Sequence, residues 1–232
     1  MALVLLTSVL PLATAQEQGS PVRWWHSAIA VGGLSALMLL DRPVQRFAQN
    51  HRGAGSDDVA GGFRHFGQPE GYGTVTAGLI LAGLLSHDPN LTRAGGRLGA
   101  SVLLAAGFVG GSKLVAGRPR PDQSLDADGF VPFSGQGSLP SGHSALAFAF
   151  ATSLADDIHR PLATVGLYSL AGGVAWSRVN DNRHWLSDVA AGALVGIASA
   201  KLASGRWRIF NLRPPSLIAA PSGLSVGWHG TF

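Results

Sequence analysis

The stretch Ser177–Asp188, with the sequence SRVNDNRHWLSD, joins two apolar runs of helical length, Leu162–Trp176 and Val189–Leu202. Both runs are rich in alanine and glycine, which indicates two packed helices with a charged connection between them. His184 and Asp188 are four residues apart, so a helix that began near His184 would place both side chains on one face. The carboxylate could then accept a hydrogen bond from one ring nitrogen and leave the other nitrogen free as a nucleophile.

Arg178 closes the first of these runs, where its guanidinium could hold an anion at the same mouth. The alternative is that Arg178 and Asp188 are ordinary helix-end charges and that His184 is a packing residue. The three residues alone leave both interpretations open, and the rest of the chain decides between them.

The composition is that of closely packed apolar helices. Only 13% of the 232 residues are charged, against about 25% in a typical soluble domain, and 32 are glycines. Gly95/Gly99 and Gly192/Gly196 have the spacing that lets helix backbones approach closely, in a membrane or in a tight bundle. The chain has no cysteine, which excludes thiolate metal sites, and its basic residues are scattered, which disfavours nucleic-acid binding.

Six apolar segments predict an all-α fold, a helical bundle of about six core helices. They are Ala28–Leu40, Gly73–Leu85, Leu98–Ser112, Ser144–Ala155, Leu162–Trp176 and Val189–Leu202. Each is shorter than the roughly 20 residues of a full membrane span, although flanking residues could extend several. The polar stretch Asp41–Tyr72, with turn signals at Gly53-Ala54-Gly55 and Gly61-Gly62, is expected to form a short helix or two beside the core.

The two ends of the chain differ from this bundle. Residues 1–15 have the form of a secretory signal peptide, although no Lys or Arg precedes the apolar core, so an uncleaved leader is the alternative. The length suits one domain, and we expect a helical domain over residues 16–208. In the tail, residues 209–232, the segments Ser216–Ala220 and Leu224–Trp228 are expected to pair as a small β-hairpin.

A first group of polar residues, KLVAGRPRP at 113–121, follows the third apolar segment. Gly117 can end that helix, and two prolines then hold an extended segment that projects Arg118 and Arg120. Guanidinium groups suit bidentate contact with phosphate oxygens, and Lys113 adds a point charge. The alternative is a set of interfacial basic residues flanking a membrane helix.

A second group, LPSGHSA at 139–145, opens the fourth segment. With Ser141 as N-cap, the backbone N–H groups of Gly142 and His143 would point outward at the positive end of the helix dipole, which is a ready anion site. Gly142 has no Cβ to block an oxyanion, and His143 could protonate a leaving oxygen. An ordinary serine cap with an incidental histidine is the alternative.

In an up-and-down bundle these groups all lie at one end, which favours a functional site over incidental residues. Together they form a complete set for phosphoryl transfer without a metal. His184 would attack phosphorus, with Asp188 as its orienting carboxylate, and His143 would protonate the departing alkoxide and later help to activate water. The expected phosphate-binding residues are Lys113, Arg120, Ser141, Gly142 and Arg178.

Three motifs in this order resemble the signature of the type 2 phosphatidic acid phosphatase and vanadium haloperoxidase superfamily. They are Lys113-x6-Arg120-Pro121, Pro140-Ser141-Gly142-His143, and Ser177-Arg178-x5-His184-x3-Asp188. The resemblance implies a helical bundle, the catalytic roles given above for His184, Asp188 and His143, and no requirement for a divalent metal or other cofactor. Arg118 is not a fixed position of the motifs, and we expect at most a supporting role for it.

The superfamily includes several classes of protein. Lipid phosphatases are membrane proteins that act on lipid phosphates or diphosphates, and we favour this class. Exported soluble acid phosphatases, which act on small phosphomonoesters, are the alternative. Vanadate-dependent haloperoxidases are generally much longer, and a non-catalytic envelope protein would have no need of the intact histidines and Asp188.

The expected location is the bacterial cell envelope, because the leader indicates export. The low charge content favours the membrane, whereas the short apolar segments favour a bundle that packs on itself. We favour membrane association with the site facing the periplasm over a soluble periplasmic protein. The expected partner is a phosphorylated substrate, a lipid by preference; the exact substrate and the oligomeric state are left open.

Overall fold

The computed structural model describes residues 19–209, 216–220 and 223–227, and eight helices lie within them. The predicted all-α bundle is confirmed, and the polar stretch between the first two apolar segments forms α2 and α3. The helices are α1 (Trp24–Met38), α2 (Asp41–Asn50), α3 (Ala54–Phe66), α4 (Pro69–Leu85), α5 (Pro89–Ala116), α6 (Gly142–Ile158), α7 (Pro161–Asn180) and α8 (Leu186–Ala203).

One predicted turn is a helix interior instead. Gly53 does precede α3 as its N-cap, but the pair Gly61-Gly62 lies inside the helix. The reason is tertiary packing: α3 lies against α7, and Phe63 packs so closely on Gly173 that a Cβ at Gly173 would overlap its ring. The burial of this aromatic side chain outweighs the weak helix propensity of two glycines.

The helix α5 is much longer than its apolar segment, with 28 residues. It starts at Pro89, behind an Asp88 carboxylate that accepts a hydrogen bond from the backbone N–H of Asn90. It ends where Gly117 adopts a left-handed conformation, with φ of 53°. An aspartate N-cap followed by proline commonly starts a helix, and a left-handed glycine commonly ends one. The helix therefore continues beyond the predicted apolar segment into the polar turns that precede it.

The centre of the bundle is a close contact between α6 and α8, with α5 packed against both. A Cβ on Gly192 would overlap the carbonyl oxygen of Ser141, and a Cβ on Gly196 would overlap that of Ala145. Gly95 and Gly99 play the same part between α5 and α4, where they face Ile80 and Thr76. Both small-residue pairs in the sequence therefore mark helix contacts, as their spacing predicted.

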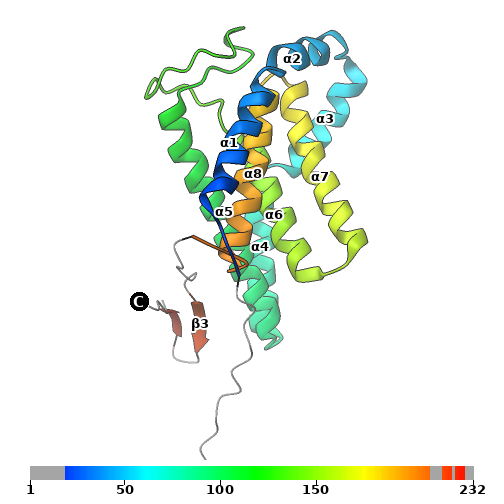
Figure 1. Cartoon of the computed structure of the whole chain (residues 1–232). Helices are drawn as coiled ribbons and strands as arrows, with labels where there is room; N and C mark the ends of the chain where they lie inside the picture. Colours follow the sequence, from blue (N-terminus) through cyan, green and yellow to red (C-terminus); the bar gives the residue numbers. More distant parts are fainter. Residues whose placement is uncertain (1–18, 210–215, 221–222, 228–232) are drawn as a thin grey trace, which may run out of the picture.

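Helices that follow one another in the chain from α5 to α8 run antiparallel, so the C-terminal ends of α5 and α7 and the N-terminal ends of α6 and α8 lie together (Figure 1). The predicted gathering of polar residues at one end is therefore confirmed. The short α2 and the long loop between α5 and α6 lie at this same end (Figure 1).

Two helices of the described part of the chain, α5 and α8, are long and apolar enough to cross a membrane. The pair α1 and α2 would make a third span, bent by 49° at the break between them. Many large apolar side chains on the outside of the bundle are exposed, among them Leu103 at 74% and Leu162 at 88%. These faces match a lipid environment, and the protein is accordingly membrane-associated.

The strands are short. The predicted C-terminal hairpin is confirmed, as β3 (Ser216–Ala220) pairs antiparallel with β4 (Gly223–Gly227), which starts one residue earlier than expected. A two-residue parallel pair, β1 (Ser20–Pro21) with β2 (Trp207–Arg208), was not predicted, because two residues carry no periodic signal. The expected signal peptide lies outside the described residues.

The α6–α8 contact yields a first prediction. Gly192→Ala inserts a methyl group against the Ser141 carbonyl, so the helices must separate, and we expect a loss of about 1–3 kcal/mol in the free energy of unfolding. Gly107→Ala is the matched control, because nothing lies within 4 Å of a Cβ at that position of α5. Thermal unfolding in detergent measures both, and equal stability of the two variants would contradict the packing described.

Candidate active site

The loop that follows α5 is pinned to the helix end. A Cβ on Gly117 would overlap the carbonyl oxygen of Val131, so only glycine fits both the left-handed backbone and the close approach. The Val131 N–H donates to the Gly117 carbonyl at 3.0 Å. This contact folds residues 131–137 back over the end of α5, beside Lys113.

His184 lies at the end of the loop between α7 and α8, not on the helix as the four-residue spacing indicated. α8 begins only at Leu186, and the backbone N–H of His184 donates to the Arg178 carbonyl at 3.2 Å. His184 and Asp188 meet all the same, because Asp188 is the third residue of the helix and turns back towards the loop. The distance from Nδ1 of His184 to Oδ2 of Asp188 is 3.6 Å.

That distance is too long for a hydrogen bond, and Nδ1 of His184 is buried without another partner in the described structure. Catalytic hydrogen bonds often reach their full strength only in the complex with substrate. Since Nδ1 faces Asp188, Nε2 is the nitrogen available for nucleophilic attack. Asp188 itself is fully buried.

The N-terminus of α6 is available to an anion. Ser141 is the N-cap residue, as predicted, but its hydroxyl makes no cap hydrogen bond and instead accepts one from the Ser144 hydroxyl at 3.1 Å. The first amides of a helix have no intrahelical acceptor, so those of Gly142 and His143 are left for a ligand. The Ser141 N–H donates to the Asp188 carbonyl at 2.9 Å, which ties this helix end to α8.

Lys113 and Arg120 line a polar cavity of about 590 Å³ together with Gln123 and the segment 134–137. Neither cation forms a salt bridge with any carboxylate in the described structure, although both are half-buried. Two half-buried positive charges without a counter-charge, beside a helix N-terminus, have the chemistry to hold an anion.

Arg178 is held differently. Its Nη1 donates to Asp181 at 3.1 Å, and Arg64 of α3 donates to the same carboxylate at 2.8 Å. The Nε of Arg178 is buried and has no partner in the described residues. A bound phosphate oxygen would satisfy this donor. Asp181, which the three motifs do not include, therefore fixes the direction of the guanidinium, and Arg64 shares that carboxylate.

The two histidines lie outside the candidate spans, and the pKa of each is lowered, which favours the neutral ring. Burial, reinforced by the positive charges of Arg178 and Lys113, lowers the pKa of His143 to about 4. Burial also lowers the pKa of His184, although the charge of Asp188 acts in the opposite direction. A neutral His184 is the form that can attack phosphorus.

Arg118 is the residue whose place differs most from the expectation. The two prolines do not project it towards an anion; it is fully buried and binds the carboxylates of Asp41 and Asp188, each at 2.6 Å. The sequence carried no signal for this burial, because residues 117–128 form a polar loop. Nothing in the sequence indicated that Asp41 would bind Arg118.

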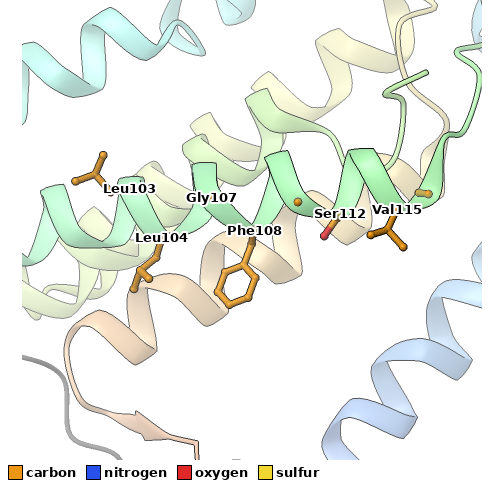
Figure 2. A pocket seen from close by; sticks show the side chains of 8 residues that line it. Leu103, Leu104, Gly107, Phe108, Ser112 and Val115 are labelled. Carbon is orange, nitrogen blue, oxygen red and sulfur yellow. The ribbon is translucent and has the colours of Figure 1, made fainter. Parts of the chain in front are cut away.

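An apolar groove of about 710 Å³ runs along α5 close to the cationic site. Figure 2 shows Leu104 and Phe108 projecting from α5 at one end of the groove and Ser112 and Val115 near the other. The groove therefore ends within one helical turn of Lys113. Among the described residues, no group of three or more His, Cys, Asp or Glu could hold a metal ion.

The fold and the site together indicate the class of protein to which the chain belongs. A family model described as the PAP2 superfamily matches residues 94–210, which includes all three motifs. The chain therefore belongs to the PAP2 superfamily of phosphatases, as its motifs predicted.

Among curated proteins, the chain is similar to the lipid A 1-phosphatase of Porphyromonas gingivalis, with 40% identity over 106 residues. The similarity covers 45% of this chain and 21% of that protein, so the chain matches about a fifth of its relative's length.

Two crystal structures share the fold. The first is Aquifex aeolicus LpxE, with a TM-score of 0.55 over 71% of this chain and 94% of that one. The second is a transmembrane PAP2 type phosphatidylglycerolphosphate phosphatase from Bacillus subtilis, with a TM-score of 0.57 over 78% and 92%. Each is 22% identical to this chain, a likeness that concerns the fold alone.

The glycine at the start of α6 yields a second prediction. A Cβ on Gly142 would lie 3.6 Å from Val109, an ordinary contact, so the protein itself leaves room for a methyl group. We expect Gly142→Ala to fold normally but to weaken binding of inorganic phosphate about tenfold, or ~1.4 kcal/mol, because the methyl group enters the anion site. Calorimetric titration measures this, with Gly107→Ala as control. Unchanged affinity would remove Gly142 from the site.

Proposed function

We propose that the protein is a metal-independent phosphatase of the cell-envelope membrane that hydrolyses a lipid phosphate or diphosphate through a phosphohistidine intermediate. The observation that carries the proposal is the convergence of His184, His143 and Asp188 on one helix-bundle end that also presents unpaired cations and free helix amides. Each of these groups has a part in phosphoryl transfer, and nothing else about the fold requires them at one place.

In the first half-reaction, Nε2 of His184 attacks phosphorus and the bond from phosphorus to the leaving oxygen breaks. Protonated His143 donates its proton to that oxygen, which leaves as an alcohol. The ring of His184 becomes positively charged as the new P–N bond forms. Closure of the 3.6 Å gap to Asp188 would stabilise that charge.

In the second half-reaction, His143 is neutral and takes a proton from water as the water oxygen attacks phosphorus. The P–N bond breaks, the electron pair returns to Nε2 of His184, and inorganic phosphate leaves. Throughout, Lys113, Arg120 and Arg178, with Ser141 and the Gly142 amide, would meet the charge on the non-bridging phosphate oxygens.

A lipid substrate is supported by the apolar groove beside Lys113, by the exposed apolar faces of the helices and by the candidate spans. The similarity to a lipid A 1-phosphatase makes a glycolipid phosphate of that kind the first substrate to test. A soluble phosphomonoester is the alternative, since the cavity at Lys113 and Arg120 is itself polar and open to small phosphates.

The third prediction concerns activity. Purified protein in excess EDTA should release phosphate from micellar lipid A 1-phosphate or phosphatidate much faster than from an aryl phosphate. His184→Ala should lower turnover by at least about 10⁴-fold, because no other nucleophile is available. Lys201→Met is a control at the far end of α8, where Lys201 pairs with Asp156.

The outcomes of this assay separate the candidates. Preference for the aryl ester would identify a soluble-substrate phosphatase of the same mechanism. Full activity of His184→Ala would refute the phosphohistidine intermediate, and a strict requirement for added metal would refute the metal-independent mechanism.

The fourth prediction concerns the proton on His143. Its pKa of about 4 is held down by burial and by the positive charges of Arg178 and Lys113, and a bound phosphate anion would offset those charges. We expect inorganic phosphate to raise the pKa of His143 by at least about one unit, or ~1.36 kcal/mol. Only protonated His143 can donate, so kcat should fall as pH rises through the raised pKa.

Nuclear magnetic resonance of ¹⁵N-histidine-labelled protein in detergent measures this pKa with phosphate and with chloride at equal ionic strength. A pKa that stayed the same or fell on addition of phosphate would exclude His143 as the general acid.

A further inference from the structure

The buried guanidinium of Arg118 makes four hydrogen bonds within the described structure. Its Nε donates to the Ala127 carbonyl at 2.9 Å, its Nη1 to Ser187 and Asp188, and its Nη2 to Asp41. Phe130 and Trp185 cover it, with ring centroids 5.2 and 5.6 Å from the central carbon. Four of its five N–H donors therefore have partners within the protein, and the side chain has no exposed surface.

Asp41 completes the same unit from the other side. One carboxylate oxygen accepts from Arg118 at 2.6 Å and from the Ser187 hydroxyl at 2.6 Å, and the other accepts from the Ser187 N–H at 2.8 Å. Asp41 is fully buried and is the first residue of α2. It lies outside residues 94–210, the part of the chain that the family model matches.

Asp188 is bound at both of its oxygens. Oδ1 accepts from Arg118, while Oδ2 accepts from the Ser138 hydroxyl and from the Trp185 N–H at 2.9 Å. Oδ2 is also the oxygen that faces Nδ1 of His184. The Arg118 contact on Oδ1 and the two contacts on Oδ2 together fix the rotation of the carboxylate, and with it the direction in which Oδ2 points.

We infer that Arg118 and Asp41 are positioning residues, which hold Asp188 so that its second oxygen can bind His184 during nucleophilic attack. The inference rests on the proposed function for the role of His184. Neither residue touches the phosphate, so their effect should appear in the formation of the bond to His184 and not in the binding of a phosphate ion.

A purely structural role is the competing explanation, because removing one partner of a buried ion pair leaves an uncompensated charge and is strongly destabilising. Arg118→Lys separates the two. Lysine keeps the positive charge but cannot reach two carboxylates with a planar fork, so charge balance survives while the geometry is lost. Asp41→Asn tests the same unit from α2 with almost no change in volume.

The matched control is Asp126→Asn. Asp126 also pairs with an arginine, Arg42 at 3.1 Å, but this pair lies on the surface and does not touch the site. The same change of carboxylate to amide is thus made once inside the buried unit and once outside it. Thermal unfolding of every variant in detergent establishes which of them are folded.

The fifth prediction uses two probes of the full-length protein. Orthovanadate accepts a fifth ligand and would bond to His184, whereas inorganic phosphate occupies the cradle without that bond. By calorimetric titration, we expect Asp41→Asn and Arg118→Lys to weaken vanadate binding at least about tenfold and phosphate binding less than about twofold. Asp126→Asn should change neither affinity. With a substrate that is turned over, kcat should fall at constant KM.

Either of two results would overturn the inference: vanadate affinity unchanged in both folded variants, or vanadate and phosphate affinities that fall together. If one variant does not fold, the other still decides. Failure of the proposed function looks different, because wild-type protein would then release no phosphate from any substrate. The ratio of vanadate to phosphate affinity would still test whether Arg118 and Asp41 position Asp188 against His184.

Discussion

The close backbone contact between α6 and α8 is the constraint on which the site depends. Gly192 and Gly196 let the two helices approach until the Ser141 N–H can donate to the Asp188 carbonyl. That single contact places the anion-binding end of α6 beside the helix that carries Asp188. A larger side chain at Gly192 would separate the second motif from the third and leave each with only part of the chemistry.

The second constraint is the burial of charge. Asp188 must be buried to act on a buried His184, and an isolated carboxylate in that position would be costly. The charge of Asp188 is balanced by Arg118, and Asp41 is a second carboxylate paired with the same guanidinium. All three side chains are fully buried. By contrast, Lys113 and Arg120 line the cavity without carboxylate partners in the described residues. The cations are thus divided between a buried, paired arginine and two residues, unpaired in the described part of the chain, that the proposed function assigns to the phosphate.

The Gly142 and His143 amides belong to α6, which packs against α5, and α5 lines the apolar groove and part of the cationic cavity. A substrate with a charged head and an apolar tail would match the polar cavity and the apolar groove beside it. The candidate spans α5 and α8 carry residues of both the groove and the catalytic unit, so membrane position and chemistry are linked in the same helices.

By itself, the sequence determined the all-α bundle, the gathering of the motif residues at one end, the Gly117 helix stop and the C-terminal hairpin. These follow from local signals: apolar periodicity, small-residue spacing, caps and the order of the motifs. Only the tertiary structure decided that His184 lies in a loop, that Arg118 is buried, and that Asp41 and Arg64 support the site. The reason is that Arg118 meets Asp41 and Asp188 across 77 and 70 residues of chain, and contacts of that range depend on how whole helices pack.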